Sequence, residues 1–191
     1  MKYKPNFGTP NLPNDAIVNL PLTVLPPAQP LTPSSDQAEQ VTTSDPEPGA
    51  DQSKVLSLIQ RNLGISQPLQ SDQELVIAIE NQLPVKAISA LIKNGLQDKE
   101  VYSLIIPRRT LQHRRAKKER LSVEESDRAA RVARILALAE YISDDKDKGM
   151  RWLRSPKQRF GGHTGMEMLL TEAGGRRVEE WLHQIDHGMA A

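Results

Sequence analysis

Cysteine is absent from the 191 residues of this sequence, and aromatic residues make up only 4% of it. Without a thiol, the chain can form neither a disulfide framework nor a thiolate metal site, which fits a protein of the reducing cytoplasm. The few aromatic residues and the 14 prolines indicate that part of the chain does not contribute to a hydrophobic core. A chain of this length has room for one compact domain or two small ones.

Long apolar runs are missing as well. Residues 75–79 and 135–139 form the longest ones, and both are far shorter than the roughly 20 residues that a membrane-spanning helix needs. Residues 1–7 lack the apolar core of a secretory signal peptide. We therefore expect a cytoplasmic protein with no membrane partner.

The N-terminal quarter differs in composition from the rest. Ten of the 14 prolines lie in residues 1–50, where the only basic residues are Lys2 and Lys4. Closely spaced prolines prevent a continuous helix or strand, so we predict a disordered, proline-rich arm over residues 1–50. Residues 17–25 are apolar enough to dock on a partner as an extended strand, although a linker without a partner is the simpler interpretation.

From residue 52 onward, apolar residues recur at helical spacing. The first such stripe ends at Gly64, which is a typical helix stop, and consists of Val55, Leu56, Leu58, Ile59 and Leu63. Ser71 and Glu74 form a capping-box pattern ahead of a helix that ends by Leu83, although its β-branched residues leave a strand as an alternative. Pro84 begins another helix, which Gly95 closes. These patterns predict an all-α fold.

Basic residues are concentrated in one short segment. The net charge is only +1, yet seven Lys or Arg residues lie between positions 108 and 120. A short helix from near Asp98, a turn at residues 105–106 and a second helix from Pro107 to about Lys118 predict a helix-turn-helix, with Leu111 as its inward anchor. The predicted DNA contacts are Arg108, Arg109, Gln112, Arg114, Arg115, Lys117 and Lys118. Arg and Gln suit base edges, whereas the two lysines suit phosphates; a solvated basic helix is the simpler alternative.

A second capping-box pattern, Ser122 to Glu125, opens a helix that runs to about Ile142. Its apolar side consists of Val132, Ile135, Leu136, Leu138, Ala139 and Ile142. This helix is either a core helix or a dimer seam. Because one DNA-reading helix binds weakly, we expect a homodimer on a palindromic site, with this helix as the candidate seam. Residues 144–149 are expected to form a polar turn.

The C-terminal segment carries a third capping-box pattern, Thr164 to Glu167, and Thr171 can start a last helix from about Glu172 to His187. Trp181 is expected in the core. Gly188 can end this helix and leave a short tail of Met189, Ala190 and Ala191. We expect this tail to contact a protein partner.

Several strings occur in one order: RRTL at 108–111, LSVEESDR at 121–128, WLRSP at 152–156, FGGHT at 160–164, LLTEAG at 169–174, and Val178. This order resembles antitoxins of the Xre/MbcA/ParS class, and within that class it is most similar to Xre antitoxins paired with RES-domain toxins. The resemblance covers roughly residues 70–191. Gly165 stands where the family usually has Pro, and Ile105 replaces a Gly common in the turn.

The resemblance implies an all-helical bundle with two functions: an Xre-like helix-turn-helix over 51–121 that binds its own operator DNA, and a C-terminal domain over 122–191 that binds a RES-domain toxin. RES-type toxins consume NAD, and the antitoxin's C-terminal region plugs the toxin's cleft. The match adds Thr110 to the DNA-binding residues. It implies toxin binding by Trp152, Leu153, Pro156, Gly161, Gly162, Thr164, Leu169, Thr171, Glu172 and Gly174, together with the tail.

No enzyme pattern survives inspection. His183 and His187 have the spacing of two metal ligands on a helix, but no Glu follows the first and no third ligand is evident, so we expect no metal site. Gly161 and Gly162 have no preceding strand and no following Lys-Ser/Thr, which excludes a phosphate loop. We therefore predict no catalytic activity and no cofactor. A regulator whose C-terminal domain only dimerises or binds a small ligand remains the alternative function.

Overall fold

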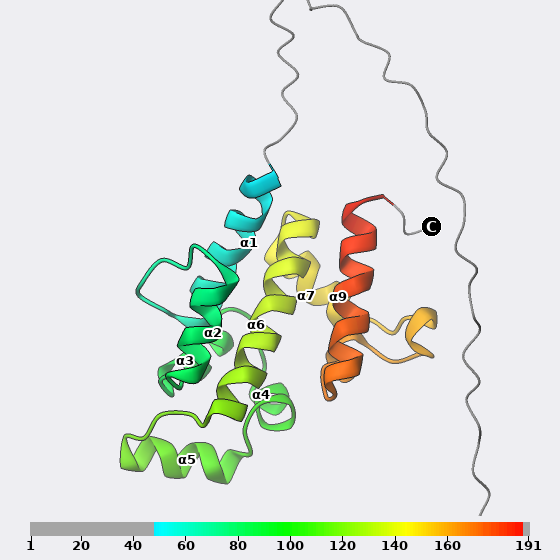
Figure 1. Ribbon diagram of the computed structural model, residues 1–191. Coiled ribbons are helices and arrows are strands. Elements are labelled where there is room, and N and C mark those ends of the chain that lie inside the picture. The colour runs from blue at the N-terminus through cyan, green and yellow to red at the C-terminus, as the bar shows by residue number, and fades with distance from the viewer. Residues whose placement is uncertain (1–47, 189–191) are drawn as a thin grey trace, which may run out of the picture. The chain divides into compact units, whose positions relative to one another are not determined.

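The computed structural model describes residues 48–188 (Figure 1). The tail of Met189, Ala190 and Ala191 lies outside this range, as does the predicted arm except for residues 48–50, which belong to the first helix. Within the described range no helix is long and apolar enough to cross a membrane.

The described residues form helices and no strands, which confirms the all-α prediction. The helices are α1 (Pro48–Leu63), α2 (Asp72–Glu80), α3 (Lys86–Lys93), α4 (Asp98–Leu104), α5 (Arg108–Lys117), α6 (Val123–Ser143), α7 (Lys146–Arg154), α8 (Gly165–Met168) and α9 (Glu172–Asp186), with a 3₁₀ turn at Gln158–Phe160. Two isolated β-bridges join Pro84 to Arg120 and Pro156 to Thr164. The strand alternative for residues 75–79 is wrong, because they lie inside α2.

Helix α6 is the centre of the fold (Figure 1). It packs most extensively against α1, α7 and α9, and also against α2, α3 and α4. Buried residues occupy most of its length, including Ala129, Ala133, Ala137 and Leu138. The small alanine side chains let neighbouring helices approach closely. Its own chain covers the apolar side of this helix, so α6 is a core helix, and only its remaining polar face is open to a second copy.

Polar groups buried against α6 have partners. The Asn62 side chain donates a hydrogen bond to the Ala133 carbonyl (3.2 Å), and the Leu83 amide donates to the Ser126 hydroxyl (2.9 Å). A buried polar group without a partner would cost about 1–3 kcal/mol. These bonds therefore fix the register of α1 and of the α2–α3 loop on the central helix.

The predicted helix starts are largely confirmed. Ser122 and Thr164 form complete capping boxes with Glu125 and Glu167. Ser71 also caps its helix, but the Glu74 carboxylate accepts from the Gln70 amide instead of completing the box. Each cap satisfies backbone N–H groups that the first turn of a helix leaves without partners.

The polar turn expected over residues 144–149 is wrong beyond its first two residues. Asp144 ends α6 in the left-handed conformation (φ 50°), and Asp145 caps the new helix α7 by accepting from the Lys148 amide. Gly149 lies against the backbone of α6, where a Cβ atom would stand 2.8 Å from the Ala139 carbonyl oxygen. Close helix packing therefore accounts for this glycine.

A half-buried ion pair joins α4 to α7. The Arg154 guanidinium donates to both Glu100 carboxylate oxygens (2.8 Å each) and to the Gly95 carbonyl (2.8 Å). Burial by itself would raise the pKa of Glu100. Hydrogen bonds from Arg154 and the Gln97 amide, together with the nearby positive charges, outweigh it and hold the pKa below its ordinary value. The charged pair therefore stabilises the contact between the two helices.

We predict that this pair contributes to stability above the ordinary carboxyl pKa of 4.5 and that the contribution is lost as the pH falls through the lowered pKa of Glu100. The Glu100→Gln variant should be less stable than the unsubstituted protein at neutral pH, by about 1–3 kcal/mol, and should approach it in acid. Urea unfolding across this pH range measures the effect. The exposed Glu80→Gln serves as control, and a constant difference at every pH would contradict the assignment.

Candidate functional site

The segment from α4 to α5 forms the predicted helix-turn-helix. Ile105 and Ile106 make the turn and are almost fully buried, at 1% and 0% exposure. Pro107 stands at the N-cap of α5, and Leu111 is the one residue of α5 that is buried. Ile105 has a φ of −117°, so the turn does not need the glycine common in the family. The turn and the anchor are where the sequence predicts them.

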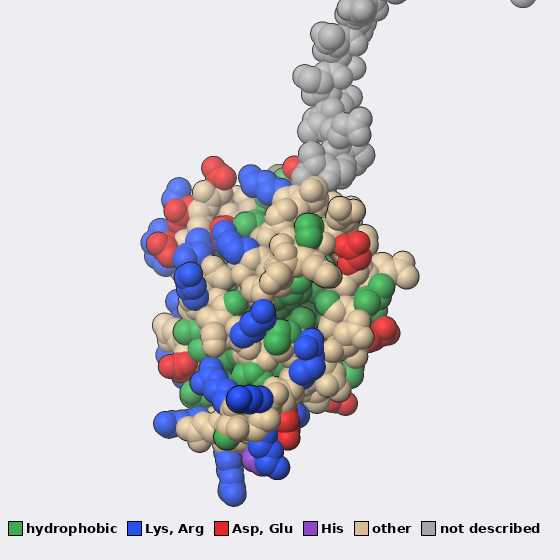
Figure 2. All heavy atoms as spheres, turned by 90° about the vertical axis from the view of Figure 1, so that its left-hand side faces the viewer, with side chains coloured by type: hydrophobic (Ala, Val, Ile, Leu, Met, Phe, Trp, Pro, Cys, Tyr) green, Lys and Arg blue, Asp and Glu red, His purple; other side chains and the backbone are tan. Residues whose placement is uncertain are grey.

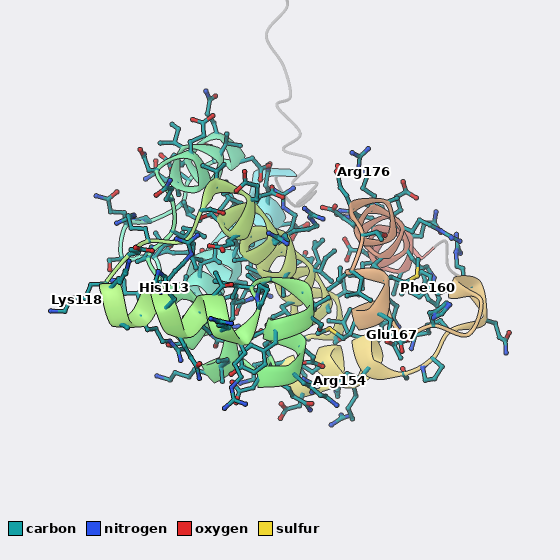
Figure 3. All side chains as sticks on the ribbon, turned by 90° about the horizontal axis from the view of Figure 1, so that it is seen from below. His113, Lys118, Arg154, Phe160, Glu167 and Arg176 are labelled. Carbon is teal, nitrogen blue, oxygen red and sulfur yellow. The ribbon has the colours of Figure 1, made fainter. Side chains whose placement is uncertain are left out.

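Helix α5 lies at one end of α6, and most of its surface faces solvent (Figure 1). Figure 2 shows Lys and Arg side chains extending from the corresponding end of the molecule. The exposed predicted DNA contacts are Arg108, Arg109, Gln112, Arg115, Lys117 and Lys118, whereas Thr110 is partly buried. No acidic residue occurs within α5 itself. Figure 3 views the molecule from below and labels His113 and Lys118 on this helix.

Arg114 differs from the other cations of α5. Its guanidinium lies 2.8 Å from one Glu125 carboxylate oxygen, donates to the other (3.2 Å), and also donates to the Arg120 carbonyl (3.1 Å). Glu125 is buried and completes the cap of α6. Arg114 therefore connects α5 to the start of the central helix instead of extending into solvent.

The chain after α5 is fixed to the α2–α3 loop. Lys118 adopts the left-handed conformation (φ 55°) and ends the helix. The Leu121 amide donates to the Leu83 carbonyl (2.9 Å), and Arg120 donates to the Gln82 carbonyl. These bonds set the direction in which α5 leaves the bundle.

In the C-terminal region, many of the predicted toxin-binding residues are structural. Leu153 and Leu169 are buried in the core, and Thr164 and Thr171 cap α8 and α9. Gly174 packs so closely that a Cβ atom would stand 2.1 Å from the Met168 carbonyl oxygen. These residues shape the domain and offer little surface to a partner, apart from the exposed Thr171.

Gly165, where the family usually has Pro, also has a packing role. A Cβ atom there would lie 3.1 Å from Leu153 Cδ2 and 3.3 Å from the Leu153 carbonyl oxygen. The glycine therefore lets α8 approach the end of α7. Thr164 keeps its capping function at this helix start without the proline.

The exposed members of the set are Pro156, Gly161, Gly162, Thr171 and Glu172. The first three belong to a loop that the Pro156–Thr164 bridge closes. Gly161 and Gly162 adopt positive φ angles of 66° and 86°, with no other atoms within 4 Å of a built Cβ. The loop therefore presents bare backbone to solvent.

An aromatic cluster supports this loop. The Trp181 ring packs against Phe160 edge-on (4.9 Å between centroids) and against Trp152 (5.1 Å). Figure 3 places Phe160 at the loop. Trp152 and Trp181 are partly buried against the core, as expected for Trp181. The cluster gives the loop a rigid base.

Sequence reasoning missed two cations of the loop. Lys157 Nζ lies 4.9 Å from the Trp152 ring centroid, and Arg159 lies 5.6 Å from that of Trp181. Burial lowers the pKa of Lys157. Their position shortly before Phe160 was the only signal in the sequence. Both add positive charge to the exposed loop.

The histidine pair does not gather further ligands. His183 and His187 are both exposed, and no group of three His, Asp or Glu side chains suited to a metal ion occurs within residues 48–188.

Two known families each match one part of the chain. Residues 74–134 match the antitoxin Xre-like helix-turn-helix domain, and residues 137–188 match the antitoxin Xre/MbcA/ParS C-terminal toxin-binding domain. The two matches adjoin inside α6.

Three curated proteins described as "Antitoxin Xre" are similar to this chain. The one from Pseudomonas putida is 40% identical over 120 residues, which cover 63% of this chain and 76% of the relative. Those from Yersinia enterocolitica and Photorhabdus laumondii are 33% and 32% identical over 85 and 84 residues, each covering 44% of this chain and 57% of the relative.

Adjacent glycines of α9 offer a test of the structural role of the motif. We predict that Gly174→Ala lowers the free energy of unfolding by about 1–3 kcal/mol or more, because its Cβ meets backbone. Gly175→Ala is the matched control. Its Cβ would meet the flexible Arg131 side chain at 3.3 Å and make an ordinary van der Waals contact with Leu169 Cδ2 at 3.7 Å. Alanine also favours helix over glycine by about 0.5–1 kcal/mol. Urea unfolding followed by circular dichroism separates them, and equal effects would show that Gly174 is not needed for packing.

Proposed function

Because the chain belongs to the Xre family of antitoxins, we propose that it binds and inhibits a RES-domain, NAD-consuming toxin and represses its own operon by binding operator DNA. The family is non-enzymatic, which confirms the prediction of no catalytic activity. The observation that carries the proposal is the presence, on one helical core, of an exposed basic helix and a separate rigid C-terminal loop.

For DNA binding, the proposed contacts are the exposed residues of α5. Arg108 and Arg109 lie in its first turn, where a recognition helix approaches base edges. Lys117 and Lys118 lie at its end and suit phosphates. Arg114 is assigned a positioning role, because its charge is already paired with the buried Glu125.

For toxin binding, the proposed contact surface is the exposed subset of the motif. It consists of Pro156, Gly161, Gly162, Thr171 and Glu172, and the proposal extends it to the tail of Met189, Ala190 and Ala191. The other members, among them the buried Leu153, Leu169 and Gly174 and the partly buried Trp152, act through the frame that they build. The choice of a RES-domain toxin rests on the order of the C-terminal strings.

The proposed division of labour keeps the boundary near residue 121, with residues 51–121 for DNA and 122–191 for the toxin. Helix α6 begins at this boundary and packs against helices from both sides of it. The boundary is therefore one of function within a continuous helical core. Operator binding is proposed to require a homodimer, because a palindromic site is read by two recognition helices.

We predict that Arg109→Ala weakens binding to the chain's own promoter by about 1–3 kcal/mol and relaxes base preference at one position. The substitution removes the exposed guanidinium, and the complex loses a bidentate contact with a base edge. Titration of promoter fragments that carry single base changes measures both effects. Unchanged affinity and preference would remove this residue from the interface.

Two further variants calibrate this measurement. Lys118→Ala should weaken binding to all sequences alike and reduce the salt slope by about 1, since a phosphate contact releases a counterion. Arg114→Ala should also weaken binding, because Arg114 holds α5 in place. It should change the salt slope less than Lys118→Ala does, because the Arg114 charge is already paired with Glu125. A slope change equal to that of Lys118→Ala would instead make Arg114 a phosphate contact.

We also predict that deleting residues 189–191 lowers affinity for the toxin encoded beside this gene by at least about tenfold, or 1.4 kcal/mol, while promoter affinity stays unchanged. Cellular NAD and growth during co-expression report inhibition. Full protection by the shortened chain would show that the tail does not plug the cleft. Failure of the complete chain to protect against any RES-domain toxin would overturn the proposed function itself.

A further inference from the structure

Helix α2 presents an apolar surface that its own chain does not cover. Leu75 is its only fully buried residue, whereas Val76 and Ile77 are 50% and 48% exposed. Exposed large hydrophobic residues are common when they stand alone. Here two are adjacent on one short helix, and the other two within residues 48–188, Val123 and Leu170, lie elsewhere in the sequence.

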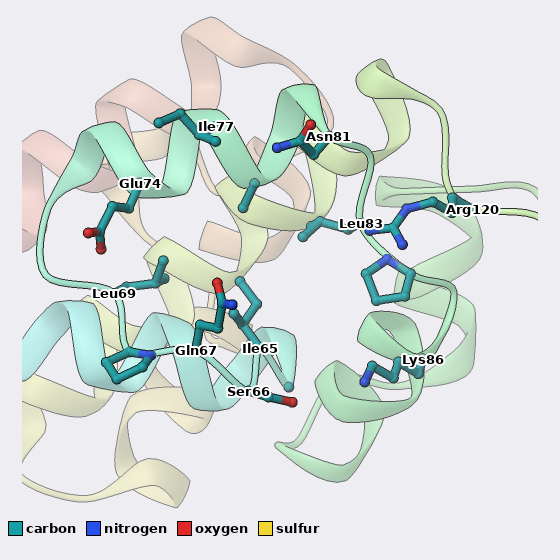
Figure 4. Close-up of a pocket in the computed structure, with 14 residues that line it drawn as sticks. Ile65, Ser66, Gln67, Leu69, Glu74, Ile77, Asn81, Leu83, Lys86 and Arg120 are labelled. Carbon is teal, nitrogen blue, oxygen red and sulfur yellow. The ribbon is translucent and has the colours of Figure 1, made fainter.

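The exposed pair forms a ridge between two hollows. On the Val76 side, a groove lies between α2, α6 and α9, with a floor of Leu75, Ile79, Ala130, Ile135 and Gly175. On the Ile77 side, a second hollow reaches the α1–α2 loop and the start of α3 (Figure 4). A ridge beside a groove is the shape that a surface needs to fit a rotated copy of itself.

The charges that line the α2–α6–α9 groove balance. The bases are Arg131, Arg134 and Arg176, and the acids are Asp127, Glu172 and Glu179. Glu172 also belongs to the proposed toxin-contact surface, so the two surfaces adjoin at the start of α9. Arg131 pairs with Asp127 (2.6 Å), Arg176 pairs with Glu172, and Arg134 lies 3.9 Å from Glu179. Figure 3 shows Arg176 on α9. Both signs are presented together, as an interface between identical surfaces requires, whereas a nucleic-acid surface would be basic throughout.

The position of the groove agrees with DNA binding by a dimer. Figure 1 shows α2 and α9 on either side of α6, with α5 across one end of it. A two-fold axis that runs parallel to α6, just outside the α2–α6–α9 groove, would place the grooves of two copies face to face. It also leaves both α5 helices at the same end, where they can meet one face of a palindromic site.

We propose that the chain forms a homodimer through α2, with the Val76 and Ile77 ridge of each copy seated in the α2–α6–α9 groove of the other. The homodimer itself is part of the proposed function, and this inference assigns its surface. The seam therefore combines α2 with the face of α6 that lines the groove, in place of the apolar side of α6, which the monomer buries.

Val76→Asp tests the surface, because it places an unpaired charge on the ridge. Sedimentation equilibrium of the full chain should show self-association weakened by at least about tenfold. Affinity for a fragment with two half-sites should fall at least as much, while affinity for a single half-site stays the same. Leu170→Asp is the matched control, since Leu170 is 59% exposed outside this surface and should leave dimerisation unchanged.

Disulfide trapping gives a second measurement that does not depend on loss of stability. The chain has no cysteine of its own, so each introduced thiol can pair only with another introduced one. Mixing the Val76→Cys and Glu179→Cys variants, distinguished by size tags, should give a cross-linked species of mixed size on oxidation. A disulfide requires Cα atoms within about 7 Å. A mixture of Leu170→Cys and Glu179→Cys is the control.

Three results would overturn the inference. The first is that the unsubstituted chain is a monomer at all concentrations. The second is that Val76→Asp leaves the dimer intact, and the third is that the mixed thiols cross-link no more than the control. If Val76→Asp abolishes toxin inhibition and leaves the dimer intact, the groove binds the toxin instead. Toxin inhibition by the unsubstituted chain is measured separately, so a failed dimer surface and a failed antitoxin function remain distinguishable.

Discussion

Close packing around α6 is the constraint on which the rest of the structure depends. Its alanines let α1, α7 and α9 approach from several sides, and Gly149 lets α7 lie directly against its backbone. The buried Asn62 and Ser126 bonds set the register of the N-terminal helices on it. A larger residue at the Gly149 contact would push α7 away from the end of α6.

The sequence predicted the features that depend on neighbouring residues. Ser122 and Glu125 lie three positions apart, and the turn at Ile105 and Ile106 follows from Pro107, so local patterns were sufficient. The pairing of Arg114 with Glu125 could not be predicted from local patterns, because it depends on how the chain turns between α5 and α6. Helix α7 was missed because its first turn is strongly charged. Helix α6 was left as either a core helix or a dimer seam, because an apolar side suits both.

The C-terminal motif shows a related limit. Its order identifies the family, yet order does not separate residues that touch a partner from those that hold the frame. Leu153, Leu169 and Gly174 are held by packing within the chain, and the exposed loop depends on the Trp181 cluster behind it. A residue that belongs to such a motif can therefore be needed for the fold of the domain without touching the partner.

The continuity of α6 also limits how such proteins can be recombined. The helix-turn-helix match ends at residue 134 and the C-terminal match begins at residue 137, so both limits fall inside one helix of 21 residues. If the DNA-binding or the C-terminal segment were exchanged for that of another member of the family, the exchange would have to preserve this helix and every surface packed on it. The two halves are thus poor cassettes for chimaeras. Under the proposed function, a change of toxin partner would be more readily reached by altering the exposed loop than by exchanging a whole half.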